Sequence, residues 1–84
     1  MDKEVGSMTL FEGQKNFFYE INGVFTEEAV ARRLRALGLN DGTTVKILNR
    51  KRNGALIVGV RGTRLALGKH ISSGIEVKEE KKDA

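Results

Sequence analysis

The sequence contains no cysteine, no proline and no tryptophan, and it has a single histidine. Without cysteine the chain forms no disulfide, holds no thiolate-bound zinc and performs no thiol chemistry. No apolar run approaches the roughly 18 residues that a membrane-spanning helix requires. The opening stretch MDKEVGSM is too polar for a secretory signal. These absences favour a cytoplasmic protein with no segment inserted into a membrane.

Residues that could carry chemistry are also few. A metal site at His70 would need further ligands, and the nearest acids that follow it are Glu76 and Glu79. A histidine without a suitably spaced second one is typical of the surface. None of the three serines lies in a nucleophile elbow, and the glycines of 59–62 lack the Lys-Ser/Thr pair of a phosphate-binding loop. We therefore expect no enzyme activity, no cofactor and no metal site.

The charge of the 84-residue chain is unevenly distributed. The net charge is +4, but residues 29–70 carry ten Lys or Arg against one acid, Asp41. Residues 1–28 and 71–84 are both net acidic. A basic middle of this kind attracts nucleic acid, an acidic protein surface or anionic lipid, and it also serves solubility alone. The charge leaves these interpretations open.

One helix is predicted, in the segment TEEAVARRLRALGL. Thr26 suits the N-cap, and the two glutamates after it favour the positive end of the helix dipole. An apolar stripe recurs at i, i+4 and i+7, formed by Val30, Leu34 and Leu37. Gly38 is typical of the C′ position, so that the next residue, Leu39, can fold back onto the last turn.

The rest of the chain predicts short strands separated by glycine. The expected strands are 14–21, 43–49, 55–60, 63–67 and 75–77, with one helical turn within 68–74. Asn22-Gly23 is a turn dipeptide, and Gly59 within a strand suggests a bulge. Because closing a short sheet removes exposed edges, we expect a mainly β fold, a small barrel of about five strands with one α-helix inserted after the first.

The expected domain occupies residues 8–78. Residues 1–7 are expected to be a disordered extension or a remnant of cloning, and 79–84 a charged flexible tail. The predicted core contains the helix stripe and the inward-facing strand residues. Its members are Val30, Leu34, Leu37, Val45, Ile47, Val58, Val60, Leu65, Leu67 and Ile75.

Three segments together resemble a known family. The run RRLRALGLNDGTTVKIL (32–48), then VRGTRLALGK (60–69) and IEV (75–77), are similar in order and spacing to the FeoA family of ferrous-iron-transport proteins. The resemblance implies an SH3-like β-barrel. It also implies a cytoplasmic accessory role with FeoB, a membrane transporter of ferrous iron that bears a GTPase domain. A related barrel forms the C-terminal domain of iron-dependent repressors.

The basic residues are the candidate contacts with such a partner. The predicted partner-binding residues are Arg32, Arg33, Arg35, Arg50, Lys51, Arg52 and Arg64. The alternatives are a basic barrel that binds nucleic acid and a repressor-like regulatory module. Barrels that bind single strands combine basic grooves with aromatic platforms, but here all five aromatic residues lie within 11–25 and none in the basic middle. We therefore expect a protein partner, no nucleic acid, and a monomer or weak homo-oligomer.

Overall fold

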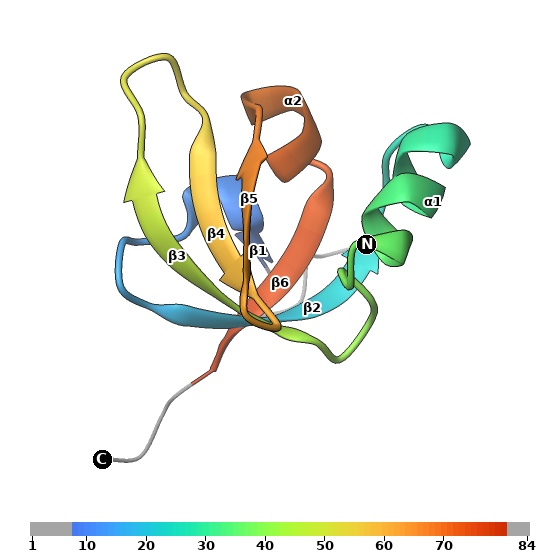
Figure 1. The fold of residues 1–84 in the computed structure, drawn as a ribbon, viewed down its shortest axis with the longest axis horizontal. Helices are drawn as coiled ribbons and strands as arrows, with labels where there is room; N and C mark the ends of the chain where they lie inside the picture. The colour runs from blue at the N-terminus through green and yellow to red at the C-terminus, as the bar shows by residue number, and fades with distance from the viewer. Residues whose placement is uncertain (1–7, 81–84) are drawn as a thin grey trace, which may run out of the picture.

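The structure, a computed structural model, describes residues 8–80 and shows a curved, six-stranded antiparallel sheet (Figure 1). The strand order is β1-β6-β2-β3-β4-β5. The strands are β1 (Met8–Thr9), β2 (Phe18–Val24), β3 (Thr44–Arg50), β4 (Leu56–Val60), β5 (Thr63–Leu67) and β6 (Ile75–Glu80). The helices are the 3-10 turn η1 (Leu10–Glu12), α1 (Glu28–Ala36) and α2 (Lys69–Ser72). The extension expected at 1–7 and the last four residues of the expected tail lie outside the described residues.

The central strands of the sheet are those predicted from the sequence, whereas the strands at its other end differ from the prediction. The strands predicted at 43–49, 55–60 and 63–67 are confirmed as β3, β4 and β5, and the predicted helical turn is α2. The sequence did not predict β1, which pairs with β6. It also placed the last strand at 75–77, whereas β6 continues to Glu80 and takes in the start of the expected tail.

The first predicted strand is displaced. Residues 14–17 precede β2 rather than form it, because Asn16 adopts a left-handed conformation with φ of 73°. The Asn16 N–H donates to the Ile47 carbonyl at 2.7 Å. Asn22-Gly23 makes no turn; both residues lie within β2, where the pairing with β6 shifts register between Ile21 and Gly23. The predicted turn was therefore wrong, and a bulge occupies its place.

Helix α1 ends as the sequence predicts and begins one residue later. Gly38 has φ of +104° and donates to the Arg35 carbonyl, while the Leu39 N–H donates to the Leu34 carbonyl, both at 3.0 Å. This pair of bonds is the Schellman motif. At the other end, Glu27 occupies the N-cap position, so the prediction of Thr26 was wrong, and no side chain caps the helix.

The buried core lies within the curved sheet, and Leu10 from η1 and Leu34 from α1 complete it. It comprises Leu10, Tyr19, Ile21, Leu34, Leu39, Val45, Ile47, Leu56, Val58, Val60, Leu67, Ile75 and Val77. Val30 and Leu65 are partly buried against it. The prediction of Leu37 was wrong, because 47% of it is exposed. Leu37 is the C-cap, where the chain leaves the helix, and the reversal at Gly38 buries Leu39 instead.

The two leucines at the end of α1 provide a test of this packing. Leu34→Ala should lower the free energy of unfolding by about 2–5 kcal/mol, because it removes a buried side chain and leaves a cavity. Leu37→Ala should cost less than about 1 kcal/mol, since water already reaches that side chain. Urea unfolding followed by circular dichroism measures both. Equal losses would contradict the observed helix end.

Candidate partner-binding surface on strands β3 to β5

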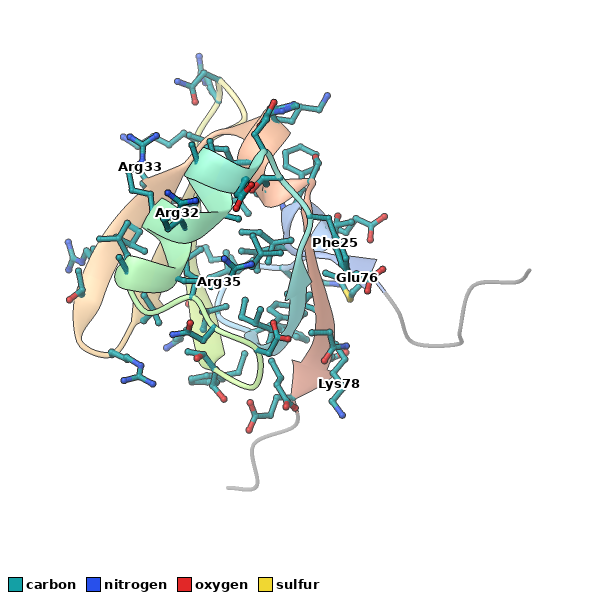
Figure 2. All side chains as sticks on the ribbon, turned by 90° about the vertical axis from the view of Figure 1, so that its right-hand side faces the viewer. Phe25, Arg32, Arg33, Arg35, Glu76 and Lys78 are labelled. Carbon is teal, nitrogen blue, oxygen red and sulfur yellow. The ribbon has the colours of Figure 1, made fainter. Side chains whose placement is uncertain are left out.

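The seven predicted partner-binding residues do not form one surface. Arg32, Arg33 and Arg35 project from α1 in Figure 2. The segment 50–52 lies at the β3–β4 connection, which Figure 1 shows at the upper left, away from α1 at the right. Arg64 lies on β5. The structure therefore separates the arginines of α1 from the basic residues 50–52 of the β3–β4 hairpin (44–60).

The helix arginines have roles within α1 itself. The Arg32 Nη2 atom lies 3.2 Å from Glu28 Oε2, and this i, i+4 pair is the one that the sequence predicts. Both side chains are exposed, so the pair adds at most a few tenths of a kcal/mol. Arg33 and Arg35 lie in the last turn, where cations favour the negative end of the helix dipole.

Arg50 holds the N-terminal segment against the sheet. Its Nη2 atom donates to the Phe11 carbonyl and to the Gly13 carbonyl, each at 2.7 Å. The guanidinium also lies over the Phe11 ring, 5.0 Å from the ring centroid. The Tyr19 hydroxyl accepts from the Gln14 N–H at 2.8 Å, and this bond fixes the same segment from β2. Arg50 is therefore occupied in joining η1 to the end of β3.

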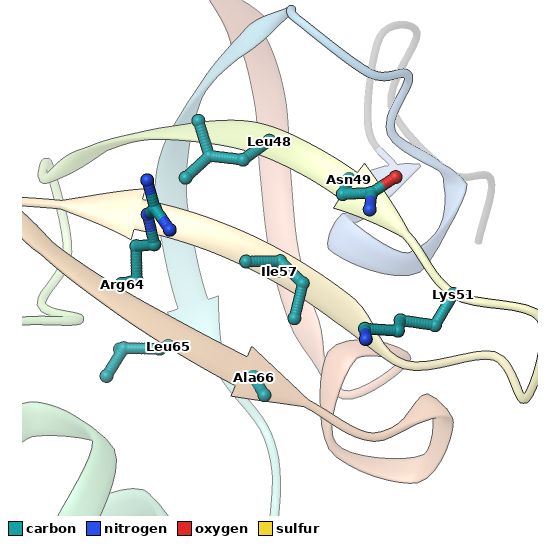
Figure 3. Close-up of a pocket in the computed structure, with 7 residues that line it drawn as sticks. All are labelled: Leu48, Asn49, Lys51, Ile57, Arg64, Leu65 and Ala66. Carbon is teal, nitrogen blue, oxygen red and sulfur yellow. The ribbon is translucent and has the colours of Figure 1, made fainter.

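Lys51 and Arg64 border a hollow on the outer face of the sheet (Figure 3). Its volume is about 590 Å³, and it crosses β3, β4 and β5. The residues that line it are Leu48, Asn49, Lys51, Ile57, Arg64, Leu65 and Ala66. Four of them are apolar, two are cations and none is acidic. Leu48, Ile57 and Ala66 form its apolar floor, Leu65 borders it although it also packs against the core, and Lys51 and Arg64 make the border positive.

A register shift in β3 shapes this floor. The shift lies between Ile47 and Asn49, opposite β4, so the bulge predicted at Gly59 is found on the neighbouring strand. Gly59 itself pairs regularly with Lys46 and Arg64. A Cβ atom at Gly59 would lie 3.3 Å from Leu48 Cδ1, so the missing side chain leaves room for Leu48. The sequence analysis identified neither Leu48 on β3 nor Ile57 on β4 as a surface residue, and for Ile57 the only signal was that β4 is apolar on both faces.

Some aromatic residues lie close to basic residues in the fold, and most of these rings are either in contact with a cation or buried. Phe11 lies near both Arg50 and Lys69, whose Nζ atom is 5.5 Å from the ring centroid. Lys46 lies 5.3 Å from the centroid of Phe18, and Tyr19 is buried. Phe17 and Phe25 are exposed. Within residues 8–80, the aromatic rings beside the basic hairpin therefore face cations.

His70 lies at the surface, on α2. Its Nε2 atom is 3.8 Å from Glu27 Oε2, and both side chains are largely exposed. Glu27 precedes α1, so this neighbour is neither of the acids nearest in sequence. Among the residues that the structure describes, no group of three His, Cys, Asp or Glu side chains could hold a metal ion. In the same part of the chain, no helix has the length and apolarity to cross a membrane.

Comparison with known proteins gives a consistent result. Residues 8–79 match the FeoA domain. The solution structure of FeoA from Chlorobium tepidum is 32% identical, with a TM-score of 0.84 over 92% of this chain and 74% of that one. The comparison with curated proteins gave no match.

Two further solved structures extend the likeness. FeoA from Stenotrophomonas maltophilia, complexed with zinc and described as a prokaryotic SH3 domain protein, is 32% identical with a TM-score of 0.75. That match covers 84% of this chain and 89% of the other. The repressor ScaR with bound Zn²⁺ is 23% identical, with a TM-score of 0.78 over 93% of this chain and 39% of that one. The fold is therefore SH3-like, as predicted, and similar to a C-terminal repressor domain.

Arg50 and Arg52 are neighbouring exposed arginines with different contacts, and they form a matched pair. Arg50→Ala should lower the free energy of unfolding by about 1–2 kcal/mol, because it removes two charge-assisted hydrogen bonds. Arg52→Ala should change it by less than about 0.5 kcal/mol. Urea unfolding of both variants measures the difference. Similar losses would mean that Arg50 does not hold η1.

Proposed function

Since this chain belongs to the FeoA family, we propose that it is a non-catalytic accessory protein that binds the cytoplasmic GTPase region of an FeoB-type transporter. The family is implicated in ferrous iron transport. The proposal places the protein on the cytoplasmic side of the membrane, where that region lies. It acts there through protein contact rather than through chemistry of its own.

The outer face of β3–β5 is the observation that carries the proposal. Exposed apolar patches bordered by polar residues mark interaction sites. The hollow there is a small example, in which the partly exposed Leu48 and Ile57 lie between Lys51 and Arg64 at its border. Within residues 8–80 neither cation lies in an ion pair, since the three pairs found involve other residues. Both charges are therefore available to an acidic partner.

The other predicted residues take different parts in this proposal. Arg32, Arg33, Arg35 and Arg52 are exposed and lie outside the hollow. Exposed charges of this kind raise the rate of encounter and fix little of the final geometry. Arg50 acts through the fold, because it holds the segment that borders the hairpin. Lys51 and Arg64 are the charges that we assign to direct contact.

The aromatic geometry favours a protein partner over single-stranded nucleic acid. Bases stack on free ring faces, and barrels that bind single strands present several of them along a basic groove. Phe11 lies against Arg50 and Lys69, Tyr19 is buried, and the exposed Phe17 and Phe25 are not among the residues that line the basic hollow. The likeness to ScaR, at 23% identity, shows a shared fold and does not by itself indicate a regulatory role.

Charge reversal at the hollow should weaken the complex. Lys51→Glu together with Arg64→Glu should lower affinity for the purified FeoB-type cytoplasmic region by about tenfold or more, mainly through faster dissociation, because the proposed contact buries both charges in the complex. The control, Arg33→Glu with Arg35→Glu, should slow association and lose its effect as salt screens the charges. Surface plasmon resonance at two salt concentrations measures both rates. If the wild-type protein does not bind the transporter region at low salt, the proposal is wrong. It is also wrong if the wild-type protein binds single-stranded DNA and not the transporter region.

A further inference from the structure

We propose that the hollow on β3–β5 binds an extended peptide segment of the partner in which an apolar side chain is flanked by carboxylates two residues away on either side. The inference rests on the proposed function and adds the chemistry of the segment that is recognised. It follows from the floor of the hollow, from its borders and from the spacing between them.

The floor favours an apolar side chain. One face of an antiparallel sheet is usually solvated and polar, yet here Leu48 and Ile57 are half-buried on the outer face beside Ala66. Gly59 contributes no side chain, and Leu48 leans over it. The resulting volume, about 590 Å³, lies within the range of sites that bind small ligands. It is large enough for the three alternate side chains of an extended segment.

The borders favour acidic residues on either side of the apolar one. Figure 3 shows Arg64 and Lys51 at opposite ends of the hollow, with Ile57 between them. Asn49 is the remaining polar residue of the lining, and no carboxylate faces the cations there. A segment with one negative charge at each end and an apolar centre complements this arrangement.

The strand register sets the spacing of the two charges. Arg64 pairs with Gly59, and Arg50 pairs with Leu56, so Lys51 follows one residue beyond. At a rise of about 3.4 Å per residue, the two cationic positions are roughly 14 Å apart along the strands. An extended peptide covers that distance in about four residues, and its side chains at i, i+2 and i+4 point to the same face. The pattern acid-x-apolar-x-acid follows.

The test uses a blocked peptide, acetyl-Glu-Ser-Leu-Ser-Glu-amide, titrated into the ¹⁵N-labelled full chain. Amide chemical shifts should change along β3, β4 and β5 around the hollow, and α1 should be unaffected. Replacing the leucine by serine, or both glutamates by lysine, should weaken binding by about tenfold. Shifts centred on α1, or equal binding of the three peptides, would overturn the inference. So would an oligothymidylate that shifts the same amides when the peptide does not.

A substitution that fills the hollow provides the matched control. Ala66 is an exposed lining residue, and Ala36 is an exposed alanine on α1, outside the hollow. Ala66→Trp should lower peptide affinity by about tenfold, whereas Ala36→Trp should leave it unchanged. The amide spectra of both variants show whether the fold is retained. If Ala66→Trp is misfolded, Lys51→Glu with Arg64→Glu provides the same readout. Undiminished peptide binding in the variant that retains the fold would overturn the inference.

The same variants separate this inference from the proposed function. If the transporter region binds wild type and Ala66→Trp equally well, the inference is wrong and the proposed function stands. If the transporter region does not bind the wild-type protein, the proposed function is wrong. The assignment of a transporter segment to the hollow is then wrong as well. Loss of both peptide and transporter binding in Ala66→Trp, with Ala36→Trp unaffected, supports both.

Discussion

The two hydrogen bonds from Arg50 to the carbonyls of Phe11 and Gly13 are the contact on which the placement of η1 beside the β3–β4 hairpin depends. They tie residues 11–13 to the end of β3, and the preceding Leu10 is fully buried in the core. The Tyr19 hydroxyl completes the attachment through Gln14. Because one basic residue is used internally and a ring is placed beside it, the contact also decides which charges and which aromatics are left for a partner.

Local signals predicted the middle of the fold well. The end of α1 follows from Gly38 and Leu39 alone. Strands β3, β4 and β5 follow from the glycines between them and from the alternation of apolar and polar residues. The sequence could not predict β1 and η1, because β1 is held by pairing with residues nearly seventy positions away and η1 by Arg50. Leu37 was misplaced because the helical period was continued past the residue where the helix ends.

The candidate site was less predictable than the fold, for reasons of geometry. A count of charges identified the basic middle, but segments adjacent in sequence emerge at different places on the sheet, as α1 and the β3–β4 connection do (Figure 1). The hollow was missed because β4 is apolar on both faces, and an apolar residue in a strand is ordinarily assigned to the core. Only the register distinguishes the outward Ile57 from the inward Val58.

The position of β6 between β1 and β2 has a consequence for the order in which the domain assembles during synthesis. Strands β2, β3, β4 and β5 pair with their neighbours in chain order, so they can associate as the chain emerges. The second edge of β2 has no partner until Ile75–Glu80 has been made, and β1 waits equally long. Pairing of β6 with β1 and β2 is therefore the least local pairing in the sheet, the kind that pays the largest loop-closure cost. The hollow, whose lining runs from Leu48 to Ala66, belongs entirely to the part that can form before it.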